Sequence, residues 1–362
     1  ATAGISSVTA GTSNFVAGVN AGNSITSGGN YNTVVGDEAG TAITTGDQNT
    51  ALGTFALTSN TTGVDNVGIG FNALDGNTTA SYNTAVGTFS LVANTTGGEN
   101  TASGYHALNA NTTGTANVAM GYKALRLNTT ASNNVAIGPT SLYDNTTGAD
   151  NVAIGKSALA NNTTASNNTA VGRSALDANT TGANNTSVGM ESLISNTTGT
   201  EHAALGFQAL KSNTTGHSNV AVGNEALENN TTASSNTAVG TKSLRANTTA
   251  VANTGIGTNS GLANTTGTNN TFVGMNAGNY VTPNTTGSEN TFLGSYAYGT
   301  AATTHSAIVI GHGVGGATEY TTIGFSSTDI RAAHGVATWA TVSDERYKKD
   351  ITTSTAGLSF IN

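Results

Sequence analysis

The feature that most constrains the fold is an internal repeat of 17 residues. An Asn recurs at this spacing from Asn32 to Asn270, with His202 taking its place once, and a Gly follows four residues after each. The consensus reads N-T/V-A-V/I-G-x-x-A/S-L-x-x-N-T-T-G/A-x-x. Disordered low-complexity segments do not keep a fixed spacing, so the repeat predicts a solenoid of stacked coils.

Each coil is predicted to be built from β-strands. Gly, Asn and Thr are poor helix formers, and a unit of 17 residues leaves no room for a pair of helices. In the segment NVAIG, Val152 and Ile154 share one face while Ala153 points the other way. The expected fold is therefore all-β, a parallel β-solenoid or β-roll in which each coil has two short strands and two tight turns.

Two apolar rows are expected to fill the coils. One consists of Leu57, Leu74, Leu91 and their equivalents up to Leu244. The other is Ile69, Val86, Met120, Ile137, Ile154, Val171, Val188, Leu205, Val222, Val239, Ile256 and Val273. A row of Asn from Asn60 to Asn264 can hydrogen-bond between coils, and the Gly after each Val or Ile suits a turn with positive φ.

The opposite strand face carries a row of Ala, interrupted by Ser187. A solvated face would carry larger polar side chains. We therefore expect the Ala face to pack against copies of the same chain, as a homotrimeric rod, because a single thin coil buries little surface. The alternative is that this face is left in solvent.

Composition shifts predict four segments. Residues 1–31 form an irregular cap, 32–299 the 17-residue-repeat shaft, 300–342 a distal β module, and 343–362 a charged segment with six charges in SDERYKKD.

Charge and residue types exclude several functions. Only 8% of residues are charged, the net charge is -8, and there is no Cys. Nucleic acid binding, membrane insertion, a metal centre and a cofactor are all unexpected. The six His are scattered, and His202 is expected to be structural.

The repeat resembles the head repeat of trimeric autotransporter adhesins over residues 14–299, although that family's unit is shorter. Heads of that family are parallel β-rolls of three chains, so the resemblance implies a trimer.

The sequence TVSDERYKKDITTSTAGLSFIN resembles the start of the intramolecular chaperone domain of phage tail fibres and endosialidase-type tailspikes. In that family the domain trimerises the fibre and is often released by self-cleavage. The resemblance implies Ser343 as nucleophile, Lys348 as its activator, and a cut after Val342. Another interpretation is a helix start with Ser343 as N-cap.

Aromatic residues concentrate late in the chain. Tyr296, Tyr298, Tyr320 and Trp339 are candidate ligand-binding residues, since exposed aromatics suit sugar or receptor contact. The alternative is a hydrophobic plug that closes the rod.

Together these features predict a structural and adhesive fibre, a phage or virus-like tail fibre that projects a distal end toward a host glycan or protein receptor. It would be located on a virion, or extracellularly. A bacterial cell-surface adhesin or filament subunit is the alternative, and an ice-binding solenoid is third. Apart from self-cleavage no enzyme is expected, because no carboxylate pair stands out along the shaft.

Overall fold

The computed structural model describes residues 5–6, 9–336 and 340–341. It divides into two compact units, Ala1–Ala238 and Val239–Asn362. Within the described residues all regular structure is β-strand, in 17-residue coils that form a parallel β-solenoid. This confirms the predicted fold class.

Each coil contributes one strand of three residues. In the first unit these are β2 (Phe15–Ala17), β3 (Thr33–Val35), β4 (Thr50–Leu52), β5 (Val67–Ile69), β6 (Thr84–Val86), β7 (Thr101–Ser103), β8 (Val118–Met120), β9 (Val135–Ile137), β10 (Val152–Ile154), β11 (Thr169–Val171), β12 (Thr186–Val188), β13 (Ala203–Leu205) and β14 (Val220–Val222). Strand β1 (Ile5–Ser6) pairs antiparallel with β2. Strand β15 (Thr237–Val239) crosses the boundary between the units.

The second unit begins with the same coils and ends differently. Strands β16 (Thr254–Ile256), β17 (Thr271–Val273), β18 (Thr291–Leu293), β20 (Ile308–His312) and β22 (Tyr320–Phe325) pair in parallel. Strands β23 (Thr328–Ala333) and β24 (Ala340–Thr341) then add antiparallel. A second small sheet joins β19 (Tyr298–Gly299) to β21 (Gly315–Gly316).

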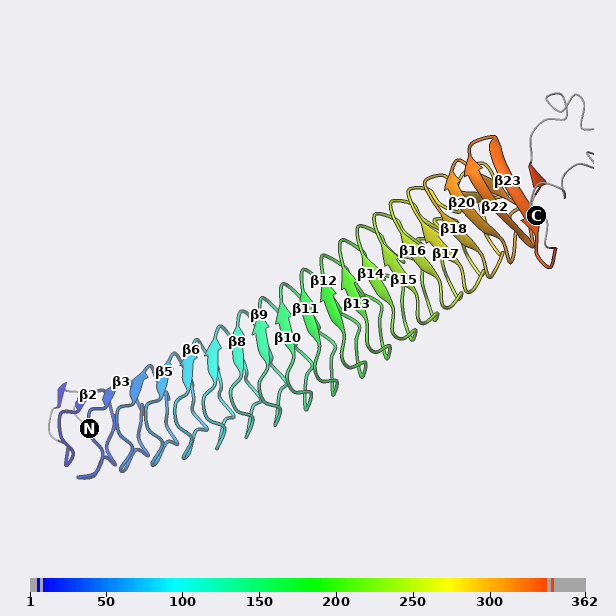
Figure 1. Ribbon diagram of the computed structural model, residues 1–362. Helices are drawn as coiled ribbons and strands as arrows, with labels where there is room; N and C mark the ends of the chain where they lie inside the picture. Colours follow the sequence, from blue (N-terminus) through cyan, green and yellow to red (C-terminus); the bar gives the residue numbers. More distant parts are fainter. Residues whose placement is uncertain (1–4, 7–8, 337–339, 342–362) are drawn as a thin grey trace, which may run out of the picture. The chain divides into compact units, whose positions relative to one another are not determined.

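Neighbouring coils are joined in register, each residue pairing with its equivalent in the next coil. Ala153 of β10 pairs with Ala136 of β9 and with Ala170 of β11, and the strands of the first unit stack side by side (Figure 1). This register aligns every residue type into a row.

The expected second strand in each coil is absent from the repeats that the structure describes. The segment around Leu159 forms turns, and Leu159 itself has a φ of 53°. That left-handed conformation is incompatible with an extended strand. The Leu159 N–H nevertheless donates to the Ala175 carbonyl of the next coil at 2.9 Å, so this side of the coil is also held by hydrogen bonds between coils.

The inner and outer strand faces are the reverse of the prediction. The Leu row is fully buried as expected, but the second buried row is Ala: Ala136 and Ala153 have no exposed surface. Ile137 and Ile154, expected inside, are each 37% exposed. The interior of each coil has room for one large side chain. Because Leu fills this space, only a small residue fits at the strand position that faces it.

The second unit shows that interior volume decides this arrangement. There Gly261 occupies the position equivalent to Leu244, and Phe272 fills the space from the Ala position of the next coil. A Cβ placed on Gly261 would lie 2.6 Å from the Phe272 ring. Large and small residues therefore exchange places while the volume is conserved.

Asn side chains line the interior wall and connect the coils, as predicted. Asn128 donates to Asn111 Oδ1 of the previous coil at 2.9 Å and to the Ala131 carbonyl at 2.9 Å. For the Asn that opens each coil, the donor to the previous coil is the backbone amide. The Asn134 backbone N–H donates to Asn117 Oδ1 at 3.0 Å. The buried amides of Asn128 and Asn117 are thus satisfied in part by their equivalents one coil away.

The Gly at the end of each strand has the positive φ expected. Gly138 has a φ of 127°, and a Cβ there would lie 2.7 Å from the backbone carbonyl carbon of Gly155. The coils approach too closely at this turn for any side chain.

Candidate functional site

The outward face of the strands carries a row that is apolar except for Ser103 of β7. We call the third strand residues the outer row; in the first unit its members exposed by more than a third are Leu52, Val86, Met120, Ile137, Ile154, Val188 and Leu205. Their exposed fractions lie between 37% and 46%. The first strand residues, Thr or Val in most coils, stand beside them with mostly intermediate exposure. The sheet therefore presents two parallel rows, one mixed and one apolar.

This face corrects the predicted self-association surface. The Ala side chains expected to meet partner chains lie inside the coil, as Ala119 and Ala136 show with no exposed surface. An apolar surface larger than about 300–600 Å² is unusual on a soluble monomer and marks an interaction site. The outer row places an exposed apolar side chain in seven strands of the first unit and is therefore a candidate interaction surface.

A second candidate site lies in the second unit, where aromatic rings surround a groove of about 230 Å³. Tyr280, Tyr296, His312 and Phe325 line it. The ring centroids of Tyr280 and Tyr296 are 4.7 Å apart, those of Tyr296 and His312 are 5.6 Å apart, and the stacked pair His312 and Phe325 are 5.3 Å apart. We call this the distal groove.

The distal groove arises where the repeat lengthens. The step from Asn270 to Asn290 is 20 residues instead of 17, and the extra residues fall around Tyr280. Tyr296 has a φ of 58°, and its N–H donates to the Met275 carbonyl at 2.9 Å. The insertion thus supplies one ring and the regular coil supplies another.

The structure brings together some of the predicted ligand-binding residues. Tyr296 lines the groove, and Tyr298, which is not part of the lining, has its ring centroid 5.8 Å from that of Tyr280. Tyr320 lies on β22 opposite Ala333, outside the groove lining. Trp339, and the predicted self-cleavage pair Ser343 and Lys348, lie outside the described residues.

The titratable groups include one strongly perturbed histidine, which is structural. His202 is 2% exposed, and its Nε2 lies 2.7 Å from the Gly216 carbonyl oxygen. Burial lowers the pKa of His202 to about 4. In the described residues no group of three or more acidic or His side chains could hold a metal, and no helix is long and apolar enough to cross a membrane.

The chain matches no known protein family, no curated protein and no solved structure. The likeness to adhesin heads and to tailspike chaperones therefore depends on the short motifs alone, and the functional argument depends on the two surfaces described above.

Proposed function

We propose that this chain is a structural and adhesive fibre, a phage or virus-like tail fibre that assembles as a homotrimer and presents a receptor-binding end. The observation that carries the proposal is the outer row, repeated coil after coil on a solenoid whose own interior is already filled. A surface with the period of the coil is matched best by another copy of the same surface.

Three chains around one axis would remove the outer row from water. Each copy presents the same flat rows, and a cyclic arrangement closes without leaving an apolar edge. In the proposed trimer the Val and Ile side chains of the outer row meet at the axis, where the Ala side chains were expected from the sequence. The intercoil hydrogen bonds, such as Val152 N–H to the Asn168 carbonyl at 2.8 Å, would make the shaft stiff.

The distal groove is the proposed contact with a host glycan. Its rings offer flat apolar faces, and the exposed His312 adds a hydrogen-bonding group. Three grooves per trimer would add weak individual contacts into firm attachment.

Binding to purified bacterial surface polysaccharides tests the adhesive role. We expect the labelled chain to bind at least one lipopolysaccharide or capsular polysaccharide in a panel, and Tyr296→Ala to weaken that binding about ten-fold. Tyr320→Ala is the matched control, because Tyr320 lies outside the groove. Absence of binding across the panel, or equal losses in both variants, would contradict the proposal.

A tail fibre and a cell-surface adhesin would both use the outer row and the distal groove. The place where the protein is found distinguishes them. Antibodies raised against the purified chain should decorate virus particles. Decoration of bacterial envelopes instead would favour the adhesin.

Ice binding is the second candidate, and the outward face favours it. In β6 Thr84 and Val86 are both more exposed than the buried Ala85 between them, and this pattern recurs in neighbouring strands. These side chains would be accessible to ice only if the chain is a monomer, because the proposed trimer covers them. A monomeric chain that inhibits ice recrystallisation would replace the fibre proposal.

Self-cleavage is proposed only on the chaperone-like motif. The protein expressed from its full gene should yield a fragment that ends at Val342 by mass spectrometry, and Ser343→Ala should remain intact. Equal processing of both proteins would exclude Ser343 as the nucleophile.

A further inference from the structure

One edge of the first unit carries a run of aromatic rings that belongs neither to the outer row nor to the distal groove. The rings come from the two positions after the strand-ending Gly in consecutive coils: Phe55, Phe71, Phe89, Tyr105, His106 and Tyr122. Neighbouring centroids lie 4.2–6.0 Å apart. Tyr105 and Tyr122 are stacked at 5.7 Å with an interplanar angle of 11°, and each is nearly half exposed.

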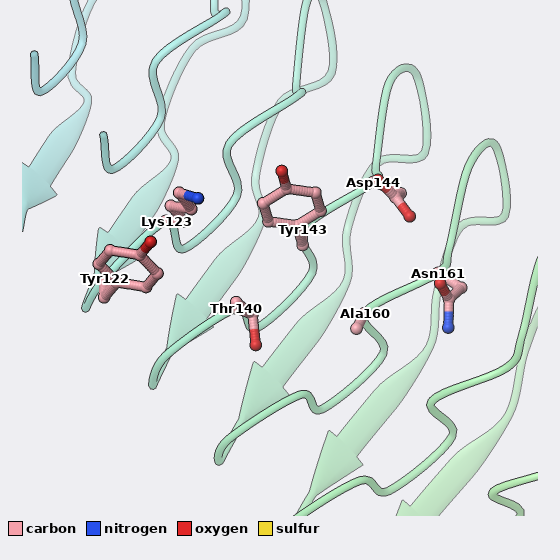
Figure 2. Close-up of a pocket in the computed structure, with 7 residues that line it drawn as sticks. All are labelled: Tyr122, Lys123, Thr140, Tyr143, Asp144, Ala160 and Asn161. Atoms are coloured by element: carbon pink, nitrogen blue, oxygen red, sulfur yellow. The ribbon is translucent and has the colours of Figure 1, made fainter. Parts of the chain in front are cut away.

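The run leads into a groove of about 270 Å³ that three coils build together. Figure 2 shows Tyr122 and Lys123 on the first coil, Tyr143 and Asp144 on the second, and Asn161 on the third. We call this the lateral groove. It combines the Tyr122 side chain, which is 49% exposed, with polar groups on its walls.

The polar groups of the lateral groove include both donors and acceptors. Arg126 donates to the Tyr143 hydroxyl oxygen, which leaves the Tyr143 O–H free to donate elsewhere. Lys123 Nζ lies 4.9 Å from the Tyr122 ring centroid. Asp144 supplies a half-buried carboxylate, and burial raises its pKa. The groove lining thus carries one ammonium group, on Lys123, and one carboxyl group, on Asp144, so that its charges are balanced.

We propose that the lateral groove binds a neutral oligosaccharide. The C–H faces of a pyranose ring pack on an aromatic ring such as Tyr122, while its hydroxyls both donate and accept hydrogen bonds. The groove offers these two kinds of contact side by side. A lining with one positive and one negative side chain, Lys123 and Asp144, suits a neutral ligand better than a strongly charged one.

The stacked rings beside the groove indicate a chain-like ligand. Tyr105 and Tyr122 are stacked on each other along the coil stack, so a ligand that extends past the groove would contact the exposed edges of both rings. The site lies wholly in the first unit and does not depend on the distal groove, so it would add attachment along the shaft.

Calorimetric titration of the intact protein with maltohexaose, cellohexaose and chitohexaose tests the proposal. We expect at least one to bind with a dissociation constant on the order of 1 mM or below. Tyr122→Ala should weaken that binding about ten-fold, and Tyr143→Phe, which keeps the ring and removes the O–H, about three-fold.

Two control variants make the result specific. Tyr82→Ala removes a tyrosine that is 61% exposed at another position of the coil, and Tyr296→Ala disables the distal groove; neither should change the titration. Circular dichroism confirms that each variant is folded. Three failed titrations of the native protein, or a loss of affinity in Tyr82→Ala equal to that in Tyr122→Ala, would overturn the proposal. A loss in Tyr296→Ala alone would assign the binding to the distal groove.

Discussion

His202 makes the stability of this solenoid depend on pH in a predictable way. It stands where other coils have Asn, and its neutral ring reproduces the two amide contacts. Nδ1 accepts from the Asn219 N–H at 3.2 Å, and Nε2–H donates to the Gly216 carbonyl at 2.7 Å. A protonated ring would lose the first contact and would place a charge in the coil interior. Desolvation is accordingly the main cause of the lowered pKa.

The sign and size follow from proton linkage. In the unfolded chain His202 titrates near 6.5, and in the folded chain near 4, so the unfolded state binds the proton more tightly between these values. The contribution of neutral His202 to the free energy of unfolding is fully present well above pH 6.5 and is lost as the pH falls toward 4. The full loss is about 3 kcal/mol, of which about 2 kcal/mol arises between pH 7 and pH 5.

Urea denaturation at these two pH values, on the native protein and on His202→Asn, measures this contribution. The native protein should lose about 2 kcal/mol more than the variant, because every other titrating group is shared and cancels in the comparison. His305→Asn is the matched control, since His305 is exposed and is not among the groups that shift the pKa of His202, and it should behave as the native protein does. An identical loss in native protein and His202→Asn would refute this reasoning.

Three further substitutions test the coil itself. Asn128→Ala removes a fully buried amide that donates to Asn111 at 2.9 Å, and should lower the unfolding free energy in urea by about 3 kcal/mol; a loss below about 1 kcal/mol would argue against the Asn row as a stabilising element. Gly138→Ala places a Cβ 2.7 Å from the Gly155 backbone at a φ of 127°, and should lower thermal stability by more than about 2 kcal/mol, whereas an unchanged melting temperature would contradict the close approach. Ala116→Asn should raise the unfolding free energy by about 0.5 kcal/mol, because Asn tolerates the φ of 55° better than Ala, and destabilisation would count against that backbone geometry.

Much of the fold follows from spacing alone. A fixed repeat of Asn, Gly and Leu implies coils stacked in register, and register then implies rows of identical residues. The buried Leu row, the Asn hydrogen bonds between coils and the positive φ of Gly138 were all predictable in this way.

The direction of the strand faces was predicted wrongly, because a period of two defines two faces without saying which is inside. The preference for burying the larger side chain is wrong here, since the interior already contains Leu. One signal was present in the sequence: where Gly261 replaces Leu, Phe272 replaces Ala one coil later. Such an exchange of volume is expected only between residues that share an interior.

The two grooves differ in how far they could be predicted. The late cluster of tyrosines was visible, but the contact of Tyr280 with Tyr296 depends on the lengthened coil. The lateral groove was missed because Tyr122 and Tyr143 occupy different positions of neighbouring coils and meet only across the stack. The available signal was the run of aromatics after the strand-ending Gly in successive repeats.

The central claim is that the outer row is the surface through which chains associate. The mass of the purified protein by light scattering, compared with that of the double variant Ile137→Glu and Ile154→Glu, tests it most directly. Three times the 35.8 kDa chain mass is predicted for the native protein, with dissociation of the folded variant to single chains. A native protein that scatters as one chain of 35.8 kDa would contradict the account.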